Sequence, residues 1–385
     1  MMNKTKEPIQ IFMDLVKIQS PLMQTGDIQL YLFEFFKNLF SDSETETDII
    51  TDEAGRNIAG YEAGNLIIRI AATPGCEHLP PLAIEAHVDT VPTTGDVIPF
   101  IEDGKVWSKG SNILGADNKS GVAAACAVAQ SLKNTPHGPT EFIFSVGEEF
   151  SMYGMKDFSL ENLNSKTVLC TDGLNSNTIF NGCLGKIKYK AHFHGTTGHS
   201  AWPEKTINAA VIAACGVEWC DKMGLLGRID DTGNTMHAVS EIMSHTGDIM
   251  FPSTNVVPAK TTVCGELRGL TPASLKKAWE KIESGFRGVT KERGGKIEIE
   301  TEIPYPPFTL PEDTGIAKRF VERNPDRNFK FEIALGSTHA NVLNQRGIET
   351  IVIGCGCRDP HQYSEHLVIK DFLESIENIT NYLKA

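Results

Sequence analysis

The segment at residues 82–92 constrains the fold of this chain most strongly. An apolar run ends in His87-Val88-Asp89, and Pro92 then prevents the strand from continuing. The pattern predicts a buried strand with an imidazole and a carboxylate at its C-terminal end, where open α/β sheets usually carry their sites. A metal-binding histidine generally passes its second ring N–H to a carboxylate, so this pair suits a metal site. Taken alone, it also suits an ordinary strand end with a solvated aspartate.

Acidic side chains also stand at three further strand or loop ends of the chain. They are Asp117 in a glycine-punctuated loop before the Ala-rich helix expected at 122–132, Glu148 and Glu149 after the strand expected at 141–146, and Asp172 after the strand expected at 167–170. Asp117 has a structural explanation as a helix cap, but two adjacent carboxylates at a strand end are costly unless a cation shares their charge. Strands alternating with helices predict a mostly parallel, doubly wound α/β sheet. We therefore expect all four sets of side chains to gather at one edge of this sheet.

The pattern changes over residues 186–303. The signals there follow the order strand, helix, strand, strand, helix, strand, which is typical of an α+β domain of the split βαβ, ferredoxin-like type. The Pro-Tyr-Pro-Pro segment at 304–307 then forms a stiff connection back to the first domain. We expect residues 1–185 and 304–385 to form one α/β domain, with residues 186–303 inserted between its two parts.

The composition is that of an ordinary globular protein. With 385 residues, of which 41% are hydrophobic and 22% charged, the chain is long enough for two or three domains. Its formal charge of −13 disfavours nucleic acid and anionic membranes as partners. The first twenty residues lack the unbroken apolar core of a signal peptide, and no run of about eighteen apolar residues could span a membrane. Nine cysteines that occur mostly singly suit buried thiols in a reducing compartment, so we expect a cytoplasmic protein.

Taken in order, the motifs resemble the M20-type co-catalytic zinc metallopeptidases, a family that includes peptidase T, carboxypeptidase G, succinyl-diaminopimelate desuccinylase and aminoacylase. The resemblance is carried by HVDTVP at 87–92, GADNKSG at 115–121, the pairs Glu148-Glu149 and Asp172-Gly173, and HQYSE at 361–365. Each piece is short, but the ordered set is specific and spans nearly the whole chain. Because GADNKSG is close to the peptidase T form, the resemblance is to the peptidase T-like branch. It implies a catalytic domain formed by 1–185 and 304–385, and a lid and dimerisation domain at 186–303.

The resemblance implies a site for two zinc ions in each chain. The implied ligands are Asp117 bridging both ions, His87 and Asp172 on one ion, and Glu149 and His361 on the other. Zinc takes imidazole and carboxylate ligands, so the implied set is chemically sensible. The family also has a cis peptide bond after its bridging aspartate, which here would join Asp117 to Asn118.

Two acidic residues near this site have implied roles other than binding metal. Glu148 resembles the general base, which takes a proton from the attacking water. Asp89 resembles the carboxylate that fixes the tautomer of the metal-binding histidine. Two alternatives remain open: His366 in place of His361 as a ligand, and an exchange of roles between Glu148 and Glu149.

Three residues of the inserted segment, His199, Asn255 and Arg268, resemble substrate-binding positions of the family. His199 matches a lid histidine that in relatives reaches across a dimer to the substrate, and the alternative is a solvated loop histidine. Arg268 suits bidentate binding of a carboxylate, and an ion pair with Glu266 explains it equally well. The chain departs from the family at His339, where relatives often have an aspartate. Because the implied metal ligands are intact, this departure bears on substrate recognition more than on hydrolysis. The resemblance therefore does not imply strict tripeptidase activity.

The resemblance implies a zinc-dependent hydrolase that cleaves a peptide bond with metal-activated water. It implies an aminopeptidase acting on short peptides, and a homodimer formed through the lid domain. The nearest alternatives are an N-acyl amino acid amidohydrolase or a carboxypeptidase of the same family, and a mononuclear amidase. The alternative from another class is a non-catalytic, metal-stabilised binding protein. The presence of Glu148, a base that metal binding does not need, argues against it.

Overall fold

The computed structural model of the protein describes residues 6–41, 45–92, 95–229, 235–245 and 254–385. Residues 1–5, which begin the segment that argues against a signal peptide, therefore lie outside the described residues. Contacts divide the chain into two compact units: unit 1 comprises Met1–Gly182, Leu310–Ala334 and Thr338–Ala385, and unit 2 comprises Cys183–Thr309 and Leu335–Ser337. The insertion expected at 186–303 corresponds to most of unit 2. The short segment at 335–337 joins unit 2 from outside the expected range.

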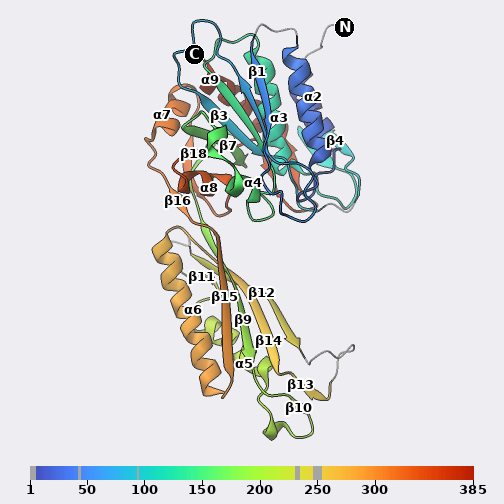
Figure 1. Ribbon diagram of the computed structural model, residues 1–385, viewed down its shortest axis with the longest axis vertical. Coiled ribbons are helices and arrows are strands. Elements are labelled where there is room, and N and C mark those ends of the chain that lie inside the picture. Colours follow the sequence, from blue (N-terminus) through green and yellow to red (C-terminus); the bar gives the residue numbers. More distant parts are fainter. Residues whose placement is uncertain (1–5, 42–44, 93–94, 230–234, 246–253) are drawn as a thin grey trace. The chain divides into compact units, whose positions relative to one another are not determined.

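A large mixed sheet forms the centre of unit 1 (Figure 1). Its strands run in the order β1 (Thr47–Thr51), β2 (Leu66–Ile70), β6 (Thr140–Ser145), β3 (Leu82–His87), β7 (Thr167–Gly173), β18 (Glu349–Gly354) and β8 (Thr178–Cys183), with β17 (Lys330–Ala334) also paired to β8. The four strands β6, β3, β7 and β18 are parallel to one another, and β1, β2 and β8 join antiparallel. The α/β class is confirmed, but the parallel arrangement is limited to the centre of the sheet.

The central strands are apolar because both of their faces are covered. All six residues of β3 and all six of β6 are buried. The helices of unit 1 are α1 (Pro8–Leu15), α2 (Gly26–Phe40), α3 (Ala116–Leu132), α4 (Tyr153–Asp157), α7 (Gly315–Glu322), α8 (His339–Gln345) and α9 (Ile369–Leu383), with a 3₁₀ turn at Leu160–Asn162. In α3 the small residues 123–127 are almost fully buried, which allows this helix to pack closely on the sheet.

A second, small sheet in unit 1 was not predicted from the sequence. Its order is β19 (Cys357–Arg358), β20 (His366–Val368), β5 (Lys105–Ser108) and β4 (Pro99–Glu102). These strands are only two to four residues long, so they carry little periodic signal. The sheet matters for the site because β19 and β20 flank the loop that carries His361.

Unit 2 has the predicted split βαβ order. The main elements are β9 (Gly185–His194), α5 (Ala209–Lys222), β12 (Met236–His245), β14 (Lys260–Gly269), α6 (Pro272–Glu292) and β15 (Lys296–Tyr305); the short ones are β10 (Gly198–His199), β11 (Gly227–Arg228), β13 (Val256–Val257), β16 (Phe308–Thr309) and a 3₁₀ turn at Pro203–Lys205. The sheet order is β11-β12-β14-β9-β15, and both helices pack on it around Phe193, Ile282 and Phe286. The ferredoxin-like prediction for this unit is confirmed.

Candidate metal centre

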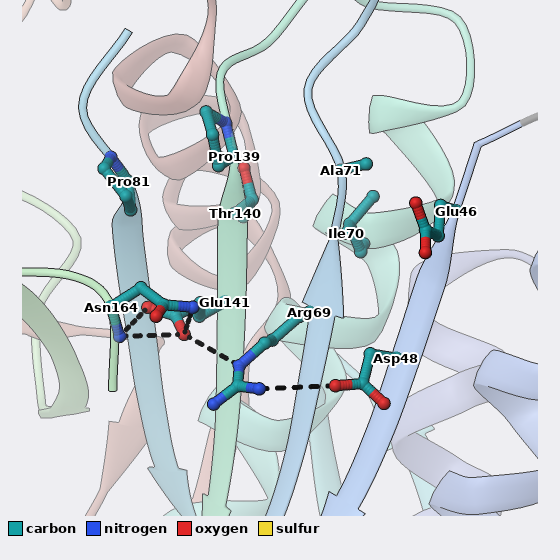
Figure 2. A pocket seen from close by; sticks show the side chains of 10 residues that line it. All are labelled: Glu46, Asp48, Arg69, Ile70, Ala71, Pro81, Pro139, Thr140, Glu141 and Asn164. Carbon is teal, nitrogen blue, oxygen red and sulfur yellow. Dashed lines mark hydrogen bonds and ion pairs between the residues drawn. The ribbon is translucent and has the colours of Figure 1, made fainter. Parts of the chain in front are cut away.

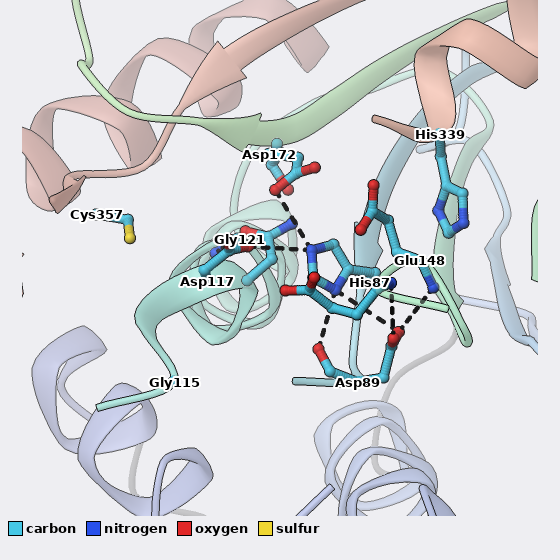
Figure 3. A network of polar contacts seen from close by, with 12 residues as sticks. His87, Asp89, Gly115, Asp117, Gly121, Glu148, Asp172, His339 and Cys357 are labelled. Atoms are coloured by element: carbon cyan, nitrogen blue, oxygen red, sulfur yellow. Dashed lines mark hydrogen bonds and ion pairs between the residues drawn. The ribbon is translucent and has the colours of Figure 1, made fainter. Parts of the chain in front are cut away.

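His87 ends β3 with its ring between two carboxylates. His87 is 1% exposed, and its Nε2 lies 3.2 Å from Asp117 Oδ1 and 3.4 Å from Asp172 Oδ1. Asp117 comes from the start of α3 and Asp172 from β7, so three elements meet here (Figure 3). The Asp117–Asn118 peptide bond is cis, as the resemblance implies. These three side chains, expected from separate strand and loop ends, are brought together.

His361 approaches the same carboxylate from the loop between β19 and β20. Its Nε2 lies 3.3 Å from Asp117 Oδ2 and 2.6 Å from Glu149 Oε1. These two carboxylates raise the pKa of the imidazole to about 10. His361 also has a φ of 65°, a left-handed conformation that is uncommon for a residue other than glycine and that clusters at functional sites. The other candidate, His366, stacks on Trp107 instead, with ring centroids 4.2 Å apart.

The two halves of this cluster share Asp117, because Oδ1 faces His87 and Oδ2 faces His361. One ligand atom each from His87, Asp117 and Glu149 lies within 4.8 Å of the others. Imidazole nitrogens and carboxylate oxygens are ligand types that zinc accepts. The residues therefore fit a metal ion in chemistry and in spacing.

Asp89 has a different partner from the one expected. The nearest acceptor of His87 Nδ1 is the backbone carbonyl of Asp89 at 3.0 Å, and the Asp89 carboxylate is 3.6 Å away. That carboxylate instead accepts the backbone N–H groups of Glu148 and Glu149, at 3.2 and 3.0 Å. The His-x-Asp segment thus orients His87 through its backbone and anchors the Glu-Glu turn through its side chain.

The crowding of acidic groups changes their pKa values. Burial raises the pKa of Asp172 to about 7. Burial also raises the pKa of Glu148 well above its ordinary value; His87 opposes this shift, and the charge of Asp172 adds to it. For Asp117 burial acts in the same direction, but the contacts with His361 and His87 hold its pKa below the ordinary value. Carboxylates this close favour a proton or a cation among them.

Glu365, from the same loop as His361, holds the Asp117 segment in place. It is 1% exposed, and its two oxygens accept the backbone N–H groups of Gly115 at 2.7 Å and Asp117 at 3.0 Å. Burial raises its pKa to about 7 even though these N–H groups favour the charged form. The sequence resemblance marked Glu365 as part of a motif without giving it a role. The structure shows that one loop supplies both His361 and the support for Asp117.

Replacing Glu365 by Ala should weaken metal binding about 10- to 100-fold, which is the usual cost of losing a group that orients a ligand. The physical reason is that the loop before Asp117 would lose two hydrogen bonds that fix its carboxylate. Competition with a coloured chelator measures this affinity. Glu332→Ala, which changes an exposed glutamate on β17, is the control. Wild-type affinity in the Glu365 variant would contradict the assigned role.

The three predicted substrate-binding residues lie in unit 2. His199 is exposed on β10, where its Nδ1 accepts the backbone N–H of Ala201 and its ring packs on Trp202. Asn255 is next to it, since its carbonyl accepts the N–H of Ser200. Arg268 donates to Glu266 at 2.7 Å, so the ion pair that was the alternative explanation is present. All of these contacts are made within unit 2, and none of them assigns a substrate-binding role to the three residues.

A separate pocket lies at the N-terminal ends of β3 and β6, at the opposite strand ends from His87 (Figure 2). Arg69 spans it and contacts Asp48 and Glu141, each at 3.3 Å. Glu141 also accepts the backbone N–H groups of Asn164 and Ser165. Arg69, Asp48 and Glu141 thus bind one another and the backbone, which is the pattern of a structural ion-pair network.

Within the described ranges, no helix combines the length and the apolar character that crossing a membrane requires.

Comparison with known proteins gives one consistent family. Residues 83–385 match the model of peptidase family M20/M25/M40. The uncharacterized protein YqjE of Bacillus subtilis is 30% identical over 382 residues, which cover 97% of this chain and 96% of that protein. Two solved structures, the aminopeptidase PepT from Bacillus cereus and a tripeptidase from Staphylococcus aureus, are each 27% identical, with TM-scores of 0.83 and 0.86; both alignments cover 98% of this chain and 97% of the other. This chain belongs to peptidase family M20/M25/M40 and is a hydrolase of that family.

Proposed function

We propose that the protein is a zinc-dependent aminopeptidase of the peptidase T type that acts on short peptides. The observation that carries this proposal is the arrangement of five side chains from separate elements, His87, Asp117, Glu149, Asp172 and His361, beside the half-buried Glu148. The similarity over the full length to an aminopeptidase and a tripeptidase supports peptides as the substrate class.

We propose that two zinc ions bind in each chain, with Asp117 shared between them. The opposite orientation of its two oxygens supports this role, because each oxygen faces a different histidine. His87 and Asp172 would complete one set of ligands, and Glu149 and His361 the other. When bound, the ions polarise the scissile carbonyl and lower the pKa of a water molecule.

Glu148 supplies the proton transfers in this proposal. Its carboxylate accepts a proton from the attacking water and delivers it to the leaving amine. A general base is most effective when its pKa lies near the working pH, and the burial that raises the pKa of Glu148 moves it in that direction. Asp89 fixes the backbone of Glu148, so the base is held in one position relative to His87.

Unit 2 would supply substrate contacts and a dimer interface. His199 and Asn255 are exposed and joined through one backbone hydrogen bond at Ser200, so they could act on one substrate group. Arg268 would bind a substrate carboxylate only by sharing its guanidinium with Glu266. We also propose a cytoplasmic location, because all nine cysteines are free thiols.

The activity is tested by assaying the zinc-loaded protein with four sets of substrates. These are di- and tripeptides with free ends, the same peptides with an acetylated N-terminus, the same peptides with an amidated C-terminus, and N-acyl amino acids. We expect cleavage of free and C-amidated peptides, and loss of cleavage on N-acetylation. Faster hydrolysis of N-acyl amino acids would show a deacylase, and loss of cleavage on C-amidation alone would show a carboxypeptidase. No turnover of any set would favour a metal-stabilised binding protein.

A further inference from the structure

Glu85 is a buried carboxylate outside the proposed ligand set. It lies two residues before His87, and because side chains alternate along a strand, both point to the same face of β3. Glu85 is 1% exposed. Its Oε1 accepts hydrogen bonds from Ser145 Oγ at 2.5 Å and from His339 Nδ1 at 2.8 Å. A buried carboxylate is costly unless such partners hold it.

His339, the first residue of α8, is the main partner of this carboxylate. It is fully buried, and its ring lies edge-on to the ring of His87, with centroids 6.4 Å apart and an interplanar angle of 86° (Figure 3). Since an ionised carboxylate only accepts hydrogen bonds, Nδ1 is the atom that donates to Glu85. The other ring nitrogen, Nε2, is buried and has no hydrogen-bond partner among the described residues.

Three strands that lead to the metal centre meet at Glu85. Ser145 is the last residue of β6 and lies just before the turn that carries Glu148. Thr171 precedes Asp172 in β7, and its Oγ1 donates to the backbone carbonyl of Glu85 at 2.9 Å. Glu85 itself belongs to β3. Glu85 therefore bonds to β6, β7 and α8 close to the strand ends that carry the candidate ligands His87 and Asp172.

We propose that Glu85 and His339 are positioning residues: their carboxylate–imidazole pair holds the ends of β3, β6 and β7 in the arrangement that binds metal, and so sets metal affinity. The inference rests on the proposed metal centre and is independent of the substrate. The pair also explains why an imidazole suits position 339. An aspartate there would place a second carboxylate beside Glu85, and like charges in a buried site are unfavourable, whereas an imidazole donates to it.

Two replacements of His339 separate the functions of its ring nitrogens. In His339→Asn the amide nitrogen occupies nearly the place of Nδ1, so we expect metal affinity within about threefold of wild type. In His339→Gln the amide lies nearer the place of Nε2 and the bond to Glu85 is lost. We expect that variant, and Glu85→Gln, to bind zinc about 10- to 100-fold more weakly. Chelator competition measures these affinities, and thermal unfolding of the metal-free proteins shows that each variant is folded. The opposite result would overturn the proposal, namely wild-type zinc affinity in His339→Gln and weakened zinc affinity in His339→Asn.

Ser145→Ala is the variant least at risk of misfolding, because it deletes one hydroxyl group. We expect it to weaken zinc binding several-fold, since Glu85 then loses the donor at Ser145 and keeps those at His339 and Cys170. The matched control is Ser165→Ala, which removes a fully buried hydroxyl at the opposite strand ends, where it donates to the carbonyls of Pro81 and Thr167. This control should lower the unfolding temperature and leave zinc affinity unchanged. If Ser145→Ala and Ser165→Ala changed zinc affinity equally, Glu85 would have only a general packing role and the inference would be refuted.

The readout is zinc affinity and not peptide turnover, so two failures can be told apart. If the variants change zinc affinity as expected and the wild-type protein cleaves no peptide, the proposed activity fails and the positioning role stands. If peptides are cleaved and the affinities do not change, only the positioning role fails.

Discussion

Glu148→Gln is expected to lower kcat by roughly 10²- to 10⁴-fold, the range that general acid–base catalysis contributes. The amide has nearly the same shape as the carboxylate but cannot accept the proton of the attacking water. The backbone of residue 148 should keep its hydrogen bond to Asp89, and the candidate ligands do not include the Glu148 side chain. Steady-state kinetics on a cleaved peptide, with zinc content measured on the same sample, tests this expectation.

The zinc content decides how a loss of activity in this variant is interpreted. With zinc content unchanged, the loss assigns proton transfer to Glu148. Glu102→Gln, which changes an exposed glutamate on β4, is the control and should keep wild-type kcat. Unchanged turnover in Glu148→Gln would remove the catalytic assignment. If Glu149→Gln lost turnover with its zinc intact while Glu148→Gln lost zinc, the two residues would have exchanged roles.

The sequence predicts the parts of this fold that local signals specify. The strands around residues 67, 84, 143 and 351 are apolar runs bounded by polar, proline or glycine residues, and all four lie in the central sheet. β1 was missed, because its segment is polar and its exposed or half-buried residues show no strong apolar run. The strands of the small sheet were missed because a strand of two to four residues has no measurable period.

Contacts between distant segments could not be predicted from local patterns. Glu365 and Asp117 are 248 positions apart, and Glu85 and His339 are 254 apart. In the sequence Glu85 looks like a polar interruption of an apolar strand, and His339 looks like a substitution in a motif. Only the packing of α8 against the strand ends shows that the two residues form a hydrogen bond with each other. The signal in the sequence was Glu85 itself, because a charge within an apolar strand must have a polar partner when the strand is buried.

Removal of zinc with a chelator is expected to abolish activity and to lower the temperature of unfolding. The metal-free centre brings the carboxylates of Asp117, Glu149 and Asp172 close to one another, and zinc bound only to the folded state stabilises it by mass action. At a free zinc concentration about a thousandfold above Kd this contribution is about 4 kcal/mol. Differential scanning calorimetry with and without zinc measures the shift, and adding zinc back should restore both properties. An unfolding temperature that zinc does not change would show that these side chains do not form the metal site.

Asp117→Asn should remove most of this zinc-dependent stabilisation, because Asp117 faces both His87 and His361 and would serve both ions. His361→Asn alters one set of ligands only, so we expect it to lose fewer ions per chain than Asp117→Asn. Asp313→Asn, at an exposed position, is the control. Metal analysis after desalting gives the number of ions, with two per chain expected for wild type. One ion per wild-type chain at full activity, together with an equal loss of bound zinc in Asp117→Asn and His361→Asn, would establish a mononuclear centre. With a single ion bound, Asp117 would be one ligand among several, so its replacement would cost no more zinc than that of His361.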